Sequence, residues 1–290
     1  MADATTLKQI ACEAIDKHAN ELREINREIW ETPELSFEEK SAHQVLTDYL
    51  EAQNFQVTRH CTLETAFRGT SGGTQGPCIG VICEYDALPE VGHACGHNLI
   101  AESGIAAAIG IKAALEATNN TLGKVVVLGT PAEEGGGGKV IMLDNGCFKD
   151  VDFCMMVHPT PVDSTVPLVL ASEFLAATFK GEAAHAAAFP WEGINALDAA
   201  VMAYSSISML RQQMKPTWRV HGVITEGGVK PNIIPDRSTI AYSVRAPTEA
   251  EKSVLKAKVV CCIEAAAKAT GIHIELSRAL RQTDRRQTGR

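Results

Sequence analysis

The stretch Lys124–Gly138 reads K-V-V-V-L-G-T-P-A-E-E-G-G-G-G, an apolar run that ends in two carboxylates and four glycines. Its first part, Lys124–Thr130, is rich in β-branched side chains and lacks alternation of apolar and polar residues, which is typical of a strand buried on both faces. Two similar runs and two helical patterns surround it along the chain. The runs are Val81–Tyr85 and Val151–His158, and the helical patterns are Ile100–Ala117 and Lys139–Asp144. Strands that alternate with helices predict an α/β fold with a mostly parallel sheet covered on both faces.

Two amphipathic helices are predicted before these strands. The apolar residues of Leu7–Ile29 recur at helical spacing, and the pattern ends before Thr32 and Pro33. A second helical pattern, Phe37–Tyr49, opens at Ser36, a residue type that caps helix N-termini. The N-terminal part therefore contributes helices to the first domain.

The second half of the chain has a different rhythm, which predicts strand, helix, strand, strand, helix and strand. The ranges are Glu173–Lys180, Ile194–Gln213, Trp218–Thr225, Ser238–Arg245, Glu249–Ala269 and Ile272–Ser277. This β-α-β-β-α-β order is the split ferredoxin-like unit. We therefore expect two domains, at residues 1–168 and 169–279, and a disordered tail at 280–290, where the sequence is polar, basic and unpatterned.

Composition limits the classes of function. Of the 290 residues, 45% are hydrophobic and 21% charged, as in an ordinary globular protein, and the net charge of -8 disfavours nucleic acid as a partner. The N-terminus lacks the pattern of a signal peptide, and no uninterrupted apolar run approaches the ~18 residues of a membrane span. We therefore expect a cytoplasmic protein that acts on a small-molecule substrate, away from membranes, and whose nine cysteines are mostly buried thiols.

Two adjacent carboxylates, Glu133 and Glu134, follow the strand at Lys124–Thr130. Side by side at a strand end they repel each other unless a cation offsets their charge or one is protonated. The alternative is a solvated loop, which is seldom attached to a fully apolar strand. A phosphate-binding P-loop is excluded because Val140 follows Lys139 where Ser or Thr is needed.

Further polar clusters follow the other two predicted strands. The first is E-Y-D-A-L-P at Glu84–Pro89 with G-H-A-C-G-H-N at Gly92–Asn98, and the second is His158. Within the first, Cys95 and His97 are two residues apart, so both point to one side of an extended segment and form a pair that suits zinc. The alternative is a buried cysteine beside a structural histidine. Together with the Glu pair, these residues make a candidate metal site, and two metals sharing a water would suit hydrolysis.

The second domain carries polar residues that fit substrate recognition. They are His185, Asn232, Asp236 and Arg245. Arginine and asparagine side chains bind carboxylates, and a histidine can donate to an oxyanion. The alternatives are loop, turn and surface ion-pair roles for the same residues.

These clusters resemble metallopeptidase family M20, which contains zinc-dependent aminoacylases, carboxypeptidase G and auxin-conjugate amidohydrolases. Four motifs match in the family's order, up to about residue 278. The resemblance implies a phosphorylase/peptidase-like catalytic domain with an inserted ferredoxin-like lid, and two zinc ions per site, with manganese as the alternative metal. The implied metal ligands are Cys95, His97, Glu134 and His158. Glu133 is implied to be the general base, and Asp86 to orient a ligand.

The resemblance also implies how the lid acts. Lids of this family commonly form homodimers, and the lid histidine, here His185, reaches the partner's active site while Asn232 and Arg245 hold the substrate. The implied reaction is hydrolysis of the amide bond of dipeptides or N-acyl amino acids with a free carboxylate. In the branch with H-x-C-G-H, the substrates include dipeptides of the β-alanyl-lysine type.

One departure from the family pattern leads to a second hypothesis. Relatives return from the lid to complete the catalytic sheet and supply a last histidine ligand, whereas no histidine follows His273 in this sequence. We therefore expect the chain by itself to be a poor catalyst. The alternative function is that of a shortened, noncatalytic isoform acting through lid-mediated dimerisation.

Overall fold

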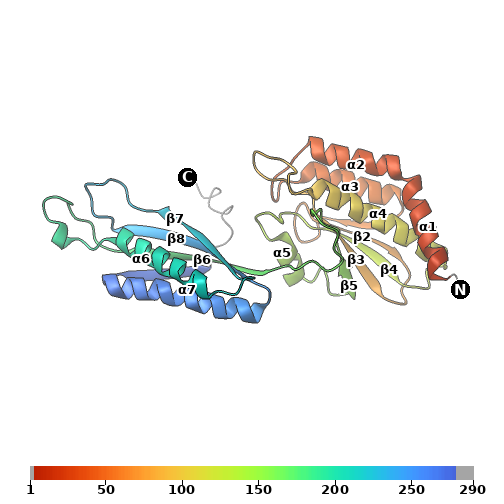
Figure 1. Cartoon of the computed structure of the whole chain (residues 1–290). Helices are drawn as coiled ribbons and strands as arrows, with labels where there is room; N and C mark the ends of the chain where they lie inside the picture. Colours follow the sequence, from red (N-terminus) through yellow and green to blue (C-terminus); the bar gives the residue numbers. More distant parts are fainter. Residues whose placement is uncertain (1–2, 279–290) are drawn as a thin grey trace. The chain divides into compact units, whose positions relative to one another are not determined.

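The computed structural model describes residues 3–278. The chain divides into two compact units between Asp163 and Ser164, each of which contains one sheet with its own helices (Figure 1). The tail expected at 280–290 lies outside the described residues.

The first unit is built on a five-stranded mixed sheet in the order β1-β2-β4-β3-β5. The strands are β1 (Gln56–Arg59), β2 (Phe67–Gly72), β3 (Cys78–Cys83), β4 (Lys124–Gly129) and β5 (Phe153–Met155). The three strands that the sequence predicted, β3, β4 and β5, are parallel to one another. The other two, β1 and β2, were not predicted, and both are antiparallel to their neighbours. The expectation of parallel pairing is therefore confirmed for β3, β4 and β5, whereas β1 and β2 add two antiparallel pairings.

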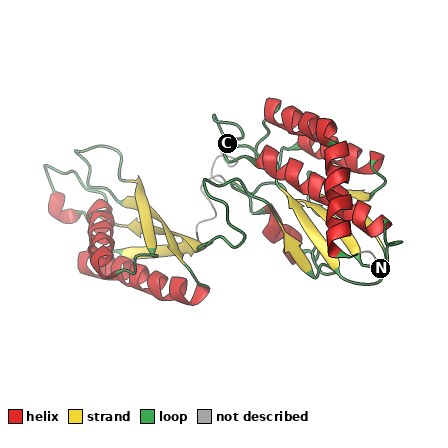
Figure 2. Cartoon of the chain, turned by 45° about the vertical axis from the view of Figure 1, so that its right-hand side comes forward, coloured by secondary structure: helices red, strands yellow, loops and turns green. Residues whose placement is uncertain are grey.

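Helices cover both faces of this sheet (Figure 2). They are α1 (Ala4–Lys17), α2 (Ala19–Glu31), α3 (Lys40–Ala52), α4 (His97–Glu116) and α5 (Gly138–Asp144). Val125 and Val127 of β4 share a core with α2, α3 and α4, whereas Val126 and Leu128 share another with Met142 of α5. Successive side chains of a strand point to opposite faces, so the unbroken apolar run of β4 is explained by burial on both sides.

The N-terminal helices differ from the prediction in their bounds. The predicted helix Leu7–Ile29 is two helices, because His18 ends α1 with φ -96° and ψ 6° and its imidazole contacts Glu21 at 2.6 Å. The helix expected to open at Ser36 begins at Lys40 instead. Phe37 adopts a left-handed φ of 67°, which is incompatible with a right-handed helix.

Helix α4 is 20 residues long with a mean hydropathy of 1.3, so by length and composition it could span a membrane. Half of that stretch is buried inside the protein, where Ile100, Ile105 and Ala108 are fully enclosed. Glu102 and Lys112 also interrupt its apolar sequence. A core position in the first unit therefore accounts for the apolar character of α4.

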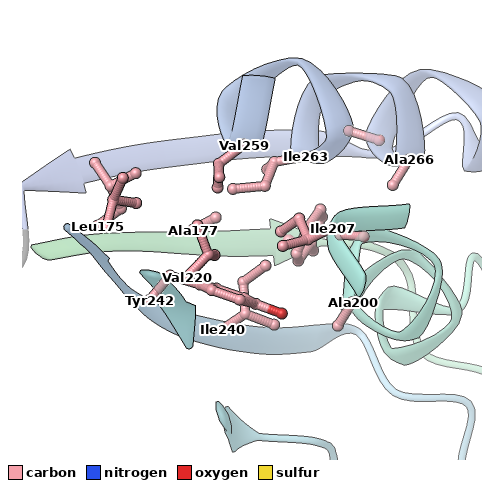
Figure 3. Close-up of a cluster of buried hydrophobic side chains, with 14 of the residues drawn as sticks. Leu175, Ala177, Ala200, Ile207, Val220, Ile240, Tyr242, Val259, Ile263 and Ala266 are labelled. Carbon is pink, nitrogen blue, oxygen red and sulfur yellow. The ribbon is translucent and has the colours of Figure 1, made fainter. Parts of the chain in front are cut away.

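The second unit has the predicted ferredoxin-like order, with a four-stranded antiparallel sheet arranged β7-β8-β6-β9. The elements are β6 (Ala171–Lys180), the short 3-10 helix Pro190–Glu192, α6 (Ala196–Met209), the 3-10 helix Leu210–Gln213, β7 (Arg219–Glu226), β8 (Arg237–Ala246), α7 (Glu249–Thr270) and β9 (His273–Arg278). Asn195 and Thr248 cap the two long helices by accepting backbone N–H groups. The core lies between the sheet and these helices, where Ala177 and Ile240 face Ile207 and Ile263 (Figure 3).

A buried histidine makes the stability of the first unit depend on pH. His43 of α3 is 4% exposed, stacks on His60 with ring centroids 4.8 Å apart, and contacts Phe67. Burial, and then the neighbouring charge of His60, lower the pKa of His43 from 6.5 to about 4. The neutral ring is therefore favoured in the folded state, so this contribution is complete above the unfolded pKa and is lost as the pH falls toward about 4.

We expect the free energy of unfolding of the first unit to fall by about 3 kcal/mol between pH 6.5 and 4 on account of His43. His43→Leu, which cannot be protonated, should remove most of this slope. The measurement is urea unfolding across that pH range, with hydrogen exchange in β4 reporting on the first unit alone. An unchanged pH slope in the variant would show that His43 is not the titrating group.

Candidate functional site

The ends of three parallel strands bring the candidate ligands together in the first unit. β3 leads directly into Glu84 and Asp86, β4 into the Glu133–Glu134 pair, and β5 into His158. The carboxyl ends of parallel strands lie along one edge of a sheet, which is where ligands collect in α/β folds. The structure therefore places the three sequence clusters at one site.

Two groups of side chains have the geometry of metal ligands. One is Cys95, His97 and His158, and the other is His97, Glu133 and Glu134; in each group the donor atoms lie within 4.8 Å of one another. The Sγ atom of Cys95 is 3.7 Å from Nε2 of His158, and Nε2 of His97 is 3.7 Å from Oε1 of Glu134. His97 belongs to both groups and so lies at the centre of the site.

The donor spacing fits a tetrahedral ion. Ligands about 2.0 to 2.3 Å from zinc, at a tetrahedral angle, are about 3.3 to 3.7 Å apart. The two separations of 3.7 Å agree with this value. Moreover, Nε2 of His97 is buried and has no hydrogen-bond partner within residues 3–278, so a cation would satisfy an otherwise costly buried polar atom.

Asp86 orients this histidine. Its Oδ1 lies 3.0 Å from Nδ1 of His97, and its Oδ2 accepts hydrogen bonds from the backbone N–H of Glu134 at 2.9 Å and from the hydroxyl of Ser36 at 3.4 Å. A proton on Nδ1 leaves the lone pair of Nε2 directed at the cluster. Asp86 thereby fixes both a histidine and the backbone of the adjacent carboxylate.

The pKa values of this pair reflect mutual stabilisation. Burial alone would raise the pKa of Asp86, but the bonds from His97 and the Glu134 backbone outweigh it and hold that pKa below 3.8. Burial would likewise lower the pKa of His97, and here the bond to Asp86, followed by the nearby carboxylates, raises it above 6.5. The site is therefore strongly negative and attracts cations.

The negative surroundings also affect the pKa of the Cys95 thiol. Burial, and then the bond and charge of Glu134, raise its pKa to about 12. Coordination to a metal deprotonates a thiol outright, so a cation would convert this group into a thiolate ligand. The sequence pattern C-G-H and the observed geometry agree on Cys95 as a ligand candidate.

A buried carboxylate that the sequence analysis did not single out supports the Glu133–Glu134 loop. Glu39 is fully buried and accepts hydrogen bonds from Ala132 N–H at 2.8 Å, Thr65 hydroxyl at 2.8 Å and Phe37 N–H at 3.0 Å. Ala132 has a left-handed φ of 57°, which turns the chain just before the two carboxylates. The only available signal was a glutamate inside a predicted helix, and its partner lies 93 residues away.

Two members of the G-H-A-C-G-H-N motif face away from the metal ligands. Nε2 of His93 lies 3.0 Å from the backbone oxygen of Ile29, and Asn98 donates to Asn26 at 3.1 Å. Both contacts are with α2. They anchor the loop that carries Cys95 to this helix.

In the second unit, the structure brings two of the predicted substrate residues together and leaves the third apart. His185 and Asn232 are exposed and lie on adjacent segments, joined by the bond from Ala186 N–H to the Asn232 backbone oxygen at 3.1 Å. Arg245 lies near the other end of β8, about 26 Å along the strand from Arg237 at ~3.3 Å per residue, and donates to Ser243 at 3.2 Å.

Asp236, also proposed from the sequence, contributes its backbone. Its carbonyl oxygen accepts from Gly181 N–H at 2.7 Å. This bond joins the end of β6 to the segment before β8. The structure thus gives Asp236 a place in the scaffold of the second unit.

Comparisons with known proteins agree with both units. The family model of the M20 peptidase dimerisation domain matches residues 174–271. The chain is 48% identical over 286 residues to the Xaa-Arg dipeptidase of Mus musculus, covering 95% of this chain and 66% of that protein. It is also 48% identical over 285 residues to the Xaa-Arg dipeptidase of Homo sapiens, covering 93% and 65% respectively. The chain thus spans just under two thirds of the length of these curated relatives.

A solved structure shows the same fold at lower sequence identity. YxeP of Bacillus subtilis, a dinuclear metal-binding peptidase, superposes with a TM-score of 0.70 at 22% identity, covering 90% of this chain and 74% of that one.

Proposed function

The chain belongs to the M20 family of peptidases, and from this premise we propose that it acts as a metal-dependent hydrolase of amide bonds in dipeptides or N-acyl amino acids. The observation that carries the proposal is the buried, unpartnered Nε2 of His97 among residues 3–278, surrounded by a thiol, an imidazole and carboxylates at ligand spacing. This donor set suits zinc, with manganese as the alternative.

The proposed ligands are Cys95, His97, Glu134 and His158. A metal bound there would supply polarisation of the scissile carbonyl and acidification of water. Asp86 would hold His97 in the required tautomer, as carboxylates commonly do for ligating histidines. These residues provide the electrostatic part of the site.

Glu133 is proposed as the general base. Its Oε2 lies 4.0 Å from Nε2 of His97, and its side chain is 35% exposed, so it borders the ligand cluster and is reachable by solvent. The carboxylate would accept a proton from the attacking water and return it to the nitrogen of the leaving amine. Its neighbour Glu134 is less exposed, at 22%, and lies closer to Nε2 of His97, at 3.7 Å, so the two adjacent carboxylates would have separate roles.

We propose dipeptides with a basic C-terminal residue, including β-alanyl-lysine, as the substrate class. The proposal is supported by the mouse and human relatives, which are named Xaa-Arg dipeptidases. The net charge of -8 also favours the approach of positively charged substrates. Arg245 would bind the free carboxylate through its guanidinium group. His185 and Asn232 lie before the start of β8 and Arg245 near its end, and this strand is much longer than a dipeptide. Within one copy of the chain, His185 and Asn232 would therefore not contact the dipeptide that Arg245 holds.

Carboxylate recognition predicts a preference for the free acid. Because a charge-assisted hydrogen bond contributes about 1.5 to 3 kcal/mol, we expect kcat/KM for β-alanyl-lysine to exceed that for its C-terminal amide by about 10- to 100-fold. Arg245→Gln should abolish this preference, whereas Arg237→Gln, at the other end of β8, should retain it. Equal rates for acid and amide with the unmodified protein would contradict the proposal.

Two further parts of the proposal concern assembly and location. We propose that the second unit pairs two copies of the chain, supported by its match to a peptidase dimerisation domain. A cytoplasmic location and the lack of nucleic-acid or membrane partners stay proposals that rest on composition and net charge. A noncatalytic protein that acts only through this pairing is the second candidate, and it differs by requiring no metal at the cluster.

A further inference from the structure

We propose that Glu84 is an additional metal-facing donor of the first unit, with its charge compensated by Lys139. The inference rests on the proposed metal centre and adds a carboxylate to it. Glu84 directly follows β3, and Lys139 lies in the first turn of α5.

The two oxygens of Glu84 have different surroundings. Its side chain is 2% exposed, and Oε1 accepts a hydrogen bond from the ammonium group of Lys139. Oε2 is buried and lacks a hydrogen-bond partner in the part of the chain that the structure describes. It lies 3.5 Å from Nε2 of His97, which is equally buried and lacks a partner there. Two buried polar atoms that make no hydrogen bond therefore face each other across this short distance.

A cation explains this juxtaposition better than a proton. Nε2 of His97 and Oε2 of Glu84 are both buried, and at 3.5 Å no hydrogen bond joins them. A proton shared between them would shorten an N–H···O contact to about 2.7 to 3.2 Å. Two donors on one tetrahedral ion lie about 3.4 Å apart, close to the observed 3.5 Å.

Lys139 explains why a further carboxylate is tolerated. Glu84, Asp86, Glu133 and Glu134 all surround His97, and a buried charge without compensation is strongly destabilising. The ammonium group of Lys139 neutralises Glu84 from the side away from His97, since it binds the other oxygen. Lys139, which follows the four glycines, does not belong to a phosphate-binding loop; its role here is to compensate the charge of Glu84.

The test measures zinc affinity, by competition with a chromophoric chelator, in the full chain. Glu84→Gln keeps the side-chain shape but removes the anionic donor, and we expect it to weaken zinc binding by at least about 10- to 100-fold, the range found for partners of metal ligands. Asp150→Asn is the matched control, because Asp150 also pairs with cations of the first unit, Arg68 and Lys124, away from the cluster. It should leave the zinc affinity unchanged.

Lys139→Met separates the donor from the ion pair. It breaks the same salt bridge but keeps the carboxylate, so it should lower the stability of the metal-free protein and alter zinc affinity much less than Glu84→Gln. Equal weakening in both variants would show that the ion pair alone matters and would overturn the assignment. If Glu84→Gln does not fold, Glu84→Asp serves instead, because it retracts the oxygens by one methylene and should also weaken zinc binding.

The outcome separates this inference from the function on which it rests. Unchanged zinc affinity in Glu84→Gln, with tight binding by the unmodified protein and by Asp150→Asn, would refute the role of Glu84 alone. Absence of zinc binding by the unmodified protein would refute the metal centre together with it.

Discussion

Glu133→Gln is expected to retain bound metal and to lower turnover by about 10²- to 10⁴-fold, the contribution of a positioned general base. The amide has nearly the shape of the carboxylate but cannot accept the proton of the attacking water. Because Glu133 is more exposed than Glu134 and lies farther from Nε2 of His97, the change should leave the proposed ligands in place. The measurements are steady-state hydrolysis of a dipeptide and the metal content of the same sample, each relative to the unmodified protein.

Glu134→Gln is the matched comparison, since it makes the same chemical change one residue along the loop. Here we expect the metal affinity itself to fall, because a neutral amide is a poorer ligand than a carboxylate. Turnover at saturating metal should recover more in this variant than in Glu133→Gln. Equal loss of metal in the two variants, without a selective loss of turnover in Glu133→Gln, would refute the assignment of the base.

Cys95→Ser is expected to weaken metal binding by more than about 100-fold, beyond the range typical of residues that only support a ligand. The hydroxyl of serine is not ionised near neutral pH, so the variant offers no anionic donor next to His158. Substitution with cobalt gives a direct readout, because a thiolate ligand produces a sulfur-to-cobalt charge-transfer absorption that serine cannot. The band should be present in the unmodified protein and absent in the variant.

Cys12→Ser is the control for this experiment. Cys12 is an exposed thiol on α1, away from the candidate ligands, so its loss should change neither affinity nor absorption. A charge-transfer band that persists in Cys95→Ser would show that another cysteine binds the metal and would remove Cys95 from the site.

The sequence predicted the features that depend on local patterns. The unbroken apolar run of β4 indicated burial on both faces, and its side chains indeed alternate between two cores. The order of elements in the second unit followed from the switch between strand and helix periodicity, strengthened by residues such as Asn195 and Thr248 that cap helices. The sequence also predicted that the polar clusters lie together, because the carboxyl ends of parallel strands meet at one edge of a sheet.

The features that escaped prediction depend on contacts between distant parts of the chain. β2 reads F-R-G-T-S-G, whose glycines and polar residues have low strand propensity, and it is stabilised by pairing with β1 and β4. The support that Glu39 gives to Ala132 spans 93 residues, and nothing near Glu39 in sequence reveals it. The orientation of Glu84 likewise depends on Lys139, 55 residues further along.

Asn232 and Arg245, both predicted to bind substrate, are separated by the length of β8. Asn232 precedes β8 and Arg245 lies near its end, so an extended strand of ten residues keeps them apart. The sequence alone does not give the distance between Asn232 and Arg245. The bounds of β8 show that the two residues lie at opposite ends of this strand.

The proposed metal centre at Cys95, His97, Glu134 and His158 can be tested by metal analysis. Protein saturated with zinc and freed of excess metal should be measured by atomic emission, next to Cys95→Ser prepared in the same way. We expect at least about one tightly held zinc ion per unmodified chain, removable by a chelator and greatly reduced in the variant. A zinc content near zero in the unmodified chain would contradict the claim.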